Sequence, residues 1–179
     1  ELYGLAYRTD FDLKNHQKHS GKTLEYFDPE TNEKLIPHVV EPTFGLTRSV
    51  LMALLSAYLK ETVKDVNGKD ETRVVLRLKP SIAPVQVAVL SLVNKLNDKT
   101  REVWDLVRPH FLTEFDTAGS IGKRYRRQDE IGTPFCVTVD FDTLKDEAVT
   151  VRERDSMKQE RVKIKELASF LRQKIEFEK

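Results

Sequence analysis

Two spacings of hydrophobic residues alternate along this chain and predict where strands and helices lie. Short runs rich in Val, Ile, Leu and Phe are typical of strands, as is a run in which Val alternates with polar residues. The predicted strands are residues 35–40, 85–90, 111–115, 135–141 and 149–151. Helical spacing of apolar residues, or a continuous run of helix formers, predicts helices over residues 45–59, 96–107, 119–131 and 164–175.

After about residue 73 the predicted strands alternate with helices, which indicates an α/β layer with a mostly parallel or mixed sheet. Before that point, turn residues at 28–33 predict a hairpin over residues 24–40. The polar segment 64–71 contains Asn67-Gly68 and either turns a hairpin or links two units. We place the domain boundary there, with a first domain at residues 1–62, a linker at 63–72 and a second domain at 73–179.

The predicted helix at 45–59 differs from the others because small and apolar residues are nearly continuous along it. This pattern predicts a helix that is buried on most of its circumference. The apolar stretch is short and ends in Lys60 and Glu61, so it does not predict a membrane span.

The composition of the chain does not by itself identify a function. The chain has 179 residues and a formal net charge of +1, so any nucleic-acid binding would depend on local basic patches. Its one cysteine, Cys136, cannot form an intrachain disulfide; its apolar or β-branched neighbours predict a buried small hydrophobe in a cytoplasmic protein. Residues 1–4 carry no signal region and no initiator Met, and we expect a cut start.

The first candidate site is a predicted strand-to-helix corner at residues 41–48. Glu41 ends the strand, and its carboxylate could bind a small ammonium group, with Thr43 adding a hydroxyl. Gly45 lets a ligand approach the backbone, and Arg48 in the first helical turn suits a phosphate. The alternative is a plain corner with a capping threonine and a solvated arginine.

The second candidate site lies in the predicted helix at 119–132, where basic residues surround Tyr125. This combination suits phosphate contacts together with stacking of an unpaired base, and Asp129 and Glu130 could accept hydrogen bonds from base amino groups. The alternative is a solvated helix face with ion pairs between side chains four positions apart. A third charged group, at residues 152–155, would be functional only as an extension of this patch.

Other patterns carry less. His16 and His19 lack a third ligand with supporting spacing, so no metal site is predicted. Gly119 and Gly122 do not form a dinucleotide fingerprint, because a third glycine and a downstream acid are not in place. Trp104 falls on or beside an apolar helix face, where packing is the default.

Over nearly its whole length the sequence resembles the glycyl-tRNA synthetases of the homodimeric type. Several matching runs are long and unusual. They are residues 8–13 with His16 and Gly21, 41–45 with Arg48, 76–78 with Ala83 and Pro84, 119–141, and 152–157 with 159–161. The resemblance implies the C-terminal portion of a class II synthetase: part of an antiparallel catalytic sheet, then an anticodon-binding domain with a mixed five-stranded sheet flanked by helices.

For the first site, the resemblance implies that residues 41–48 are the third signature motif of class II synthetases. Arg48 would clamp the terminal phosphates of ATP, Glu41 would bind the substrate ammonium, and Thr43 stands where the family usually has serine. The implied glycine pocket is Glu41, Pro42, Thr43, Phe44 and Gly45, and the implied ATP contacts are Glu1, Leu2, Gly45 and Arg48.

For the second domain, the resemblance implies anticodon recognition. The residues expected to contact anticodon bases or phosphates are Arg124, Arg126, Arg127, Asp129, Glu130, Arg152 and Arg154. Residues 116–118, Asp-Thr-Ala, depart from the acidic-acidic-serine run expected beside them.

The implied reaction ligates glycine to tRNA(Gly) through a glycyl-adenylate, with ATP and magnesium, in a full-length homodimer that needs no membrane. The first two class II motifs find no match, so we expect this chain alone to be inactive in aminoacylation. Two alternatives stay open: a non-catalytic nucleic-acid-binding module, such as the synthetase-like accessory subunit of the mitochondrial DNA polymerase, or another class II enzyme with the same C-terminal fold. Glu41 and Arg48 argue against the first, because a module without ATP has no use for a phosphate clamp beside an ammonium site.

Overall fold

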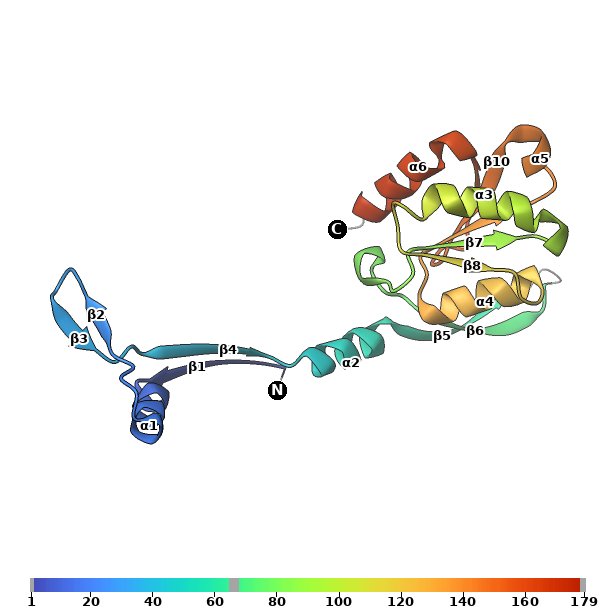
Figure 1. Cartoon of the computed structure of the whole chain (residues 1–179). Coiled ribbons are helices and arrows are strands. Elements are labelled where there is room, and N and C mark those ends of the chain that lie inside the picture. Colours follow the sequence, from blue (N-terminus) through green and yellow to red (C-terminus); the bar gives the residue numbers. More distant parts are fainter. Residues whose placement is uncertain (1, 65–67, 178–179) are drawn as a thin grey trace. The chain divides into compact units, whose positions relative to one another are not determined.

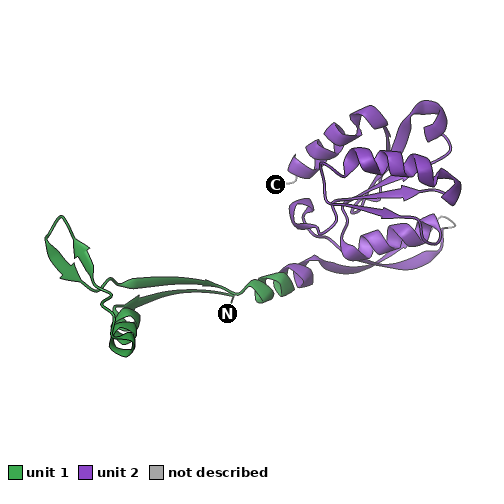
Figure 2. Cartoon of the chain, in the orientation of Figure 1, with its two compact units in different colours: residues 1–52 green, residues 53–179 purple. Residues whose placement is uncertain are grey.

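The computed structural model describes residues 2–64 and 68–177. Its chain forms two compact units, residues 1–52 and residues 53–179 (Figure 2). The division falls inside helix α2, Leu46–Ala57. Glu1, which the sequence resemblance places at the ATP, lies outside the described residues.

The first unit is built on an antiparallel ribbon of β1 (Tyr3–Thr9) and β4 (Val39–Phe44). Between them come helix α1 (Phe11–Ser20) and a small hairpin of β2 (Tyr26–Asp28) and β3 (Glu33–Leu35). The predicted hairpin is confirmed for residues 26–35, whereas residues 39 and 40 belong to the ribbon. None of the described residues before Ala53 is buried, so this unit has no hydrophobic core of its own.

The prediction that the helix near residues 45–59 is buried on most of its circumference is wrong for α2. Only Ala57, at its C-terminal end, is buried, and it packs against Leu78 and Ala83 of the second unit. The large apolar side chains are exposed, with Leu46 at 76% and Leu55 at 62%. An apolar run shows which side chains a helix is able to bury. In α2, only the last residue, Ala57, is buried.

The second unit opens with an antiparallel hairpin of β5 (Tyr58–Lys64) and β6 (Asp70–Leu76). The segment predicted as a linker, residues 63–72, contributes to both strands: Val63 pairs with Glu71 and Lys64 with Asp70. Of the two readings left open for it, the structure contains the hairpin. The change between compact units lies earlier, in α2.

A five-stranded mixed sheet follows, in the order β11-β10-β9-β7-β8. Its strands are β7 (Val87–Ser91), β8 (Thr113–Asp116), β9 (Phe135–Val139), β10 (Ala148–Glu153) and β11 (Gln159–Lys163). Strand β7 runs parallel to β8 and β9, and the remaining pairs are antiparallel. The helices are α3 (Asn97–Val107), α4 (Ile121–Ile131), the short α5 (Thr143–Asp146) and α6 (Ile164–Phe177), with 3-10 turns at Pro80–Ile82 and Asn94–Leu96.

The alternation of side chains along β7 explains why helices cover both faces of the sheet (Figure 1). Val87 and Val89 point into the main core with α3 and α6, whereas Ala88 and Leu90 point to the opposite face, under α4. Strands with two buried faces read as continuous apolar runs, as β7 does. The predicted mixed sheet flanked by helices is confirmed.

Cys136 belongs to the layer beneath α4, as a buried free thiol. Burial raises its pKa to about 12, so it packs as the small hydrophobe predicted from the sequence. Leu106, predicted on the apolar face of α3, is 39% exposed, so that face is narrower than expected. Within the described chain, no helix has both the length and the apolar character required to cross a membrane.

Candidate functional site

The β1–β4 ribbon has one polar and one apolar face at the first candidate site. The register places Ala6 opposite Glu41 and Gly4 opposite Thr43. Because side chains alternate along a strand, these four residues share one face of the ribbon. The other face carries Tyr3, Leu5, Tyr7, Val40, Pro42 and Phe44.

Small residues, Gly4 and Ala6, therefore stand across from the two polar ones. Pro42 and Phe44, predicted to line a glycine pocket, lie on the apolar face, where the Phe44 ring packs edge-on to Tyr3 at 5.4 Å between centroids. Only their backbone is available to the polar face.

The Glu41 carboxylate is held from both sides. Thr43 Oγ1 donates a hydrogen bond to Oε1 at 2.9 Å, and the guanidinium Nε of Arg8 forms an ion pair with Oε2 at 3.4 Å. Arg8 in turn binds Asp12, with Nη2 2.8 Å from Oδ1. The sequence reasoning assigned no role to Arg8, although it lies within a run that carries the family resemblance.

Gly45 follows β4, and Arg48 lies in the first turn of α2. The Gly45 N–H donates to the carbonyl oxygen of Leu2 at 2.9 Å, which extends the ribbon by one pair. A Cβ built at Gly45 would lie 3.2 Å from that oxygen and 3.5 Å from carbons of the Arg48 side chain. The Arg48 side chain thus lies close to Gly45.

The second candidate site is different from the predicted one, because several of its charged side chains are buried. Arg124 is 2% exposed and donates to the carbonyl oxygens of Ser91, Thr117 and Gly119, the last at 2.9 Å. Its guanidinium therefore joins the loops that follow β7 and β8.

Asp129 is fully buried at the centre of an ion-pair network. It accepts hydrogen bonds from Arg73 Nε at 2.8 Å and from Arg152 at 2.9 and 3.1 Å. Arg73 also donates to Glu61 at 2.7 Å. Burial alone would raise the pKa of Asp129, but the hydrogen bonds from Arg152 and Arg73 outweigh it and lower the pKa. The network fastens the β5–β6 hairpin to the sheet and to α4.

Arg154 binds the backbone at the C-terminal end of α4. Its Nη1 donates to the carbonyl oxygens of Gly132 and Leu78, both at 2.8 Å, and the residue is 3% exposed. The structure therefore buries four of the residues that the sequence resemblance implies contact the anticodon, namely Arg124, Asp129, Arg152 and Arg154. The guanidinium groups and the Asp129 carboxylate bond to partners inside the protein, whereas the buried Nε of Arg124 has no hydrogen-bond partner among the described residues.

Tyr125 does not offer a free ring for base stacking. Its hydroxyl lies 2.6 Å from Thr138 Oγ1, the Arg152 guanidinium covers the ring at 4.8 Å, and burial raises the pKa of the phenol. The tyrosine is part of the layer between α4 and the sheet.

Four charged residues remain on the outer side of α4: Lys123, Arg126, Arg127 and Glu130. Lys123 and Glu130 are exposed, and the two arginines are half-buried. Arg126 pairs with Glu71, and Arg127 donates to Asp116 and to the Ala118 carbonyl oxygen at 2.6 Å. The departure noted at residues 116–118 thus lies at the loop that Arg127 holds.

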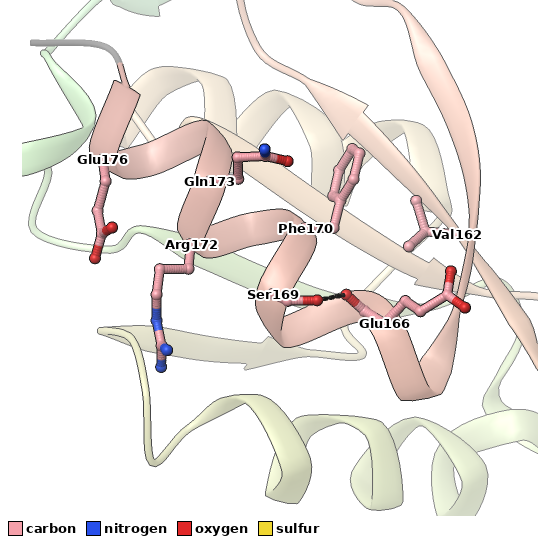
Figure 3. Close-up of a pocket in the computed structure, with 7 residues that line it drawn as sticks. All are labelled: Val162, Glu166, Ser169, Phe170, Arg172, Gln173 and Glu176. Carbon is pink, nitrogen blue, oxygen red and sulfur yellow. Dashed lines mark hydrogen bonds between the residues drawn. The ribbon is translucent and has the colours of Figure 1, made fainter.

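A shallow hollow of about 530 Å³ lies along α6, away from the predicted site residues (Figure 3). Phe170, Val162 and Arg172 are among the residues that line it. Ser169 is engaged with the Glu166 backbone carbonyl at 2.8 Å. Glu166 and Glu176 disfavour an anionic ligand, and no set of polar groups converges there to bind one.

Comparison with known proteins identifies the second unit. A model of the anticodon binding domain matches residues 86–174, the span from just before β7 into α6. The glycine–tRNA ligase of Clostridium tetani is 52% identical over 177 residues, which cover 99% of this chain and 37% of that protein. The chain carries the anticodon-binding domain of the glycyl-tRNA synthetase family.

Further glycyl-tRNA synthetases match over the same length. Those of Thermobifida fusca and Nocardia farcinica are 54% and 52% identical, and each match covers 98% of this chain and 38% of the relative. The chain therefore spans a little over a third of the length of these synthetases. Within it, the five-stranded sheet and the helices around it form the anticodon-binding domain.

Proposed function

We propose that this chain acts in a glycine–tRNA ligase, in which the first unit contributes to the glycine and ATP sites and the second binds tRNA(Gly). The observation that carries the proposal is the face of the β1–β4 ribbon shared by the Glu41 carboxylate and the Thr43 hydroxyl, followed along the chain by Arg48, whose side-chain carbons lie 3.5 Å from a Cβ built at Gly45. A carboxylate suits the ammonium of an amino acid, and a guanidinium suits phosphates.

On this proposal Glu41 binds the ammonium of glycine, and Thr43 keeps the carboxylate in place. The substrate lies on the face that Glu41 shares with Gly4 and Ala6, where these small residues add little bulk. Arg48, at the N-terminal turn of α2, holds the terminal phosphates of ATP, where the helix dipole also favours negative charge. Magnesium, when bound, neutralises the triphosphate and supports the departure of pyrophosphate.

The reaction then needs no covalent enzyme intermediate. A carboxylate oxygen of glycine attacks the α-phosphorus of ATP and pyrophosphate leaves, which gives the adenylate. A hydroxyl of the terminal ribose of tRNA next attacks the acyl carbon, and AMP leaves. The residues of this chain contribute by positioning and by charge stabilisation.

For tRNA binding we propose the outer side chains of α4, namely Lys123, Arg126, Arg127 and Glu130. Cations there suit phosphates, and Glu130 can accept a hydrogen bond from a base amino group. The buried network beneath them keeps the helix fixed, which lowers the entropic cost of binding.

The test is glycine-dependent exchange of pyrophosphate into ATP by the full-length protein that contains this chain. We expect exchange with glycine, and loss of glycine affinity in Glu41→Gln. Exchange supported by a different amino acid instead would identify another class II enzyme. No exchange with any amino acid, alongside retained nucleic-acid binding, would favour the non-catalytic module. The 179 residues by themselves are not expected to catalyse aminoacylation.

A further inference from the structure

We propose that Arg8 is a positioning residue for the glycine site, fixing the Glu41 carboxylate through a relay that begins at Asp12. This inference rests on the proposed function, because it assigns the relay to the substrate-binding role of Glu41. The relay joins three elements of the first unit: Asp12 on α1, Arg8 on β1 and Glu41 on β4.

The geometry of the relay is a planar cation shared by two carboxylates. Both Nε and Nη2 of Arg8 donate to Asp12, and Nε also lies 3.4 Å from Glu41 Oε2. The hydrogen bond to Asp12 raises the pKa of Arg8, and the same bond lowers the pKa of Asp12. Asp12 thus holds Arg8 through Nε and Nη2, and the same Nε forms the ion pair with Glu41.

A glutamate needs such support if it is to select one small ammonium group. Its side chain has three rotatable bonds, and an unsupported carboxylate would sample positions that do not meet the substrate. Thr43 engages Oε1 and Arg8 engages Oε2, so both oxygens of Glu41 are fixed from the side of the ribbon. Gly4 and Ala6 lie across from Thr43 and Glu41 on the same face of the ribbon.

The charge balance of the relay fits the same ligand. Asp12 and Glu41 are two anions and Arg8 is one cation, so the cluster carries one net negative charge. One ammonium group neutralises it. Without Asp12, the charge of Arg8 would cancel that of Glu41 and weaken its attraction for the ammonium.

A purely local role is the competing explanation, because Arg8 and Asp12 are four residues apart and could simply secure the start of α1. That explanation predicts a loss of stability without selectivity for one substrate. The chain offers a matched control on the same helix: Lys14 forms an ion pair with Asp10, also four residues apart, and contacts no residue of the proposed site.

The experiment measures pyrophosphate exchange by the full-length protein carrying Arg8→Ala, Arg8→Lys, Asp12→Asn, Glu41→Gln or Lys14→Ala. We expect Arg8→Ala to raise the KM for glycine by about 10- to 100-fold, since misplacing a positioning group typically costs that much. The KM for ATP and the Tm should equal those of Lys14→Ala. Arg8→Lys should recover part of the loss, because lysine keeps the charge without the planar fork. Asp12→Asn should shift the KM for glycine in the same direction by less.

Two results would overturn the inference while leaving the function in place. One is a KM for glycine in Arg8→Ala equal to that of Lys14→Ala while Glu41→Gln is impaired. The other is an equal rise of both KM values with a lowered Tm, as a structural role predicts. If Glu41→Gln also binds glycine normally, the proposed function itself fails.

Discussion

The carboxylate of Asp129 binds the guanidinium of Arg152 at two points, with Oδ1 2.9 Å from Nη1 and Oδ2 3.1 Å from Nη2. This pairing joins the last turn of α4 to β10 in the interior of the second unit. Arg73 adds a third hydrogen bond, so one carboxylate organises two buried cations. Asp129 and Arg152, which the sequence pattern assigned to a nucleic-acid-binding patch, therefore form buried ion pairs inside the domain.

Removing that carboxylate should destabilise the chain strongly. In Asp129→Asn the two guanidinium groups stay buried without their shared anion, and breaking one side of a buried pair costs about 3–5 kcal/mol. Urea unfolding of the 179-residue chain measures the difference. The control is Asp105→Asn, which removes a carboxylate that is 48% exposed and paired with Arg108, and should change stability by less than about 1 kcal/mol. Equal effects for the two variants would contradict the structural role of Asp129.

The pH dependence of stability should also change in Asp129→Asn. The folded-state pKa of Asp129 is lowered, so its contribution is complete above the unfolded-state value of about 4 and is lost as the pH falls below it. The wild-type chain should lose stability on acidification from pH 5 toward pH 2, in the range set by those values. The variant should lose less over the same interval. Parallel curves from denaturant titrations at each pH would argue against a charged Asp129 in the folded protein.

Gly132 should not tolerate a side chain. It ends α4 with a φ of 87°, and a Cβ there would lie 2.9 Å from the carbonyl oxygen of Leu76. Gly132→Ala therefore combines backbone strain with a clash against main chain, and we expect a loss of about 2 kcal/mol or more. Gly122→Ala provides the contrast, because nothing lies within 4 Å of a Cβ there and it is inside a helix. That variant should gain about 0.5–1 kcal/mol in thermal unfolding experiments.

The outer arginines of α4 should contribute to tRNA binding. Arg126→Ala and Arg127→Ala are expected to weaken binding of the chain to tRNA(Gly), and each should lower the slope of log K against log salt by about one. Lys145→Ala is the control, since Lys145 is 78% exposed on α5 and pairs only locally with Asp142. Salt titrations that give the same slope for all three variants would remove Arg126 and Arg127 from the interface.

Much of the second unit could be predicted because its signals are local. The continuous apolar run of β7 and the helical spacing of α6 each follow from the side chains that the element itself buries. The hairpin β2–β3 likewise follows from its turn residues. Such patterns depend only on residues that are close in sequence, so they can be recognised from one sequence alone.

The charged network could not be predicted because its partners are distant in sequence. Arg73 and Asp129 are 56 positions apart, and the residues around each of them do not indicate that the two side chains pair. An arginine on a polar helix reads as solvated by default, yet Arg124 is buried because loop carbonyl oxygens supply its acceptors. The exposure of α2 could not be predicted for a related reason. An apolar pattern shows that a helix is able to pack against other elements, but it does not show which elements cover it.

The absence of buried side chains among the described residues of the first unit has a consequence for handling the chain. Backbone segments that break few apolar contacts on opening are the ones that proteases reach first. Limited digestion would therefore remove the ribbon and α1 early, leaving a resistant piece that begins within α2. That piece, with its buried arginines and five-stranded sheet, is the part of the chain expected to survive digestion.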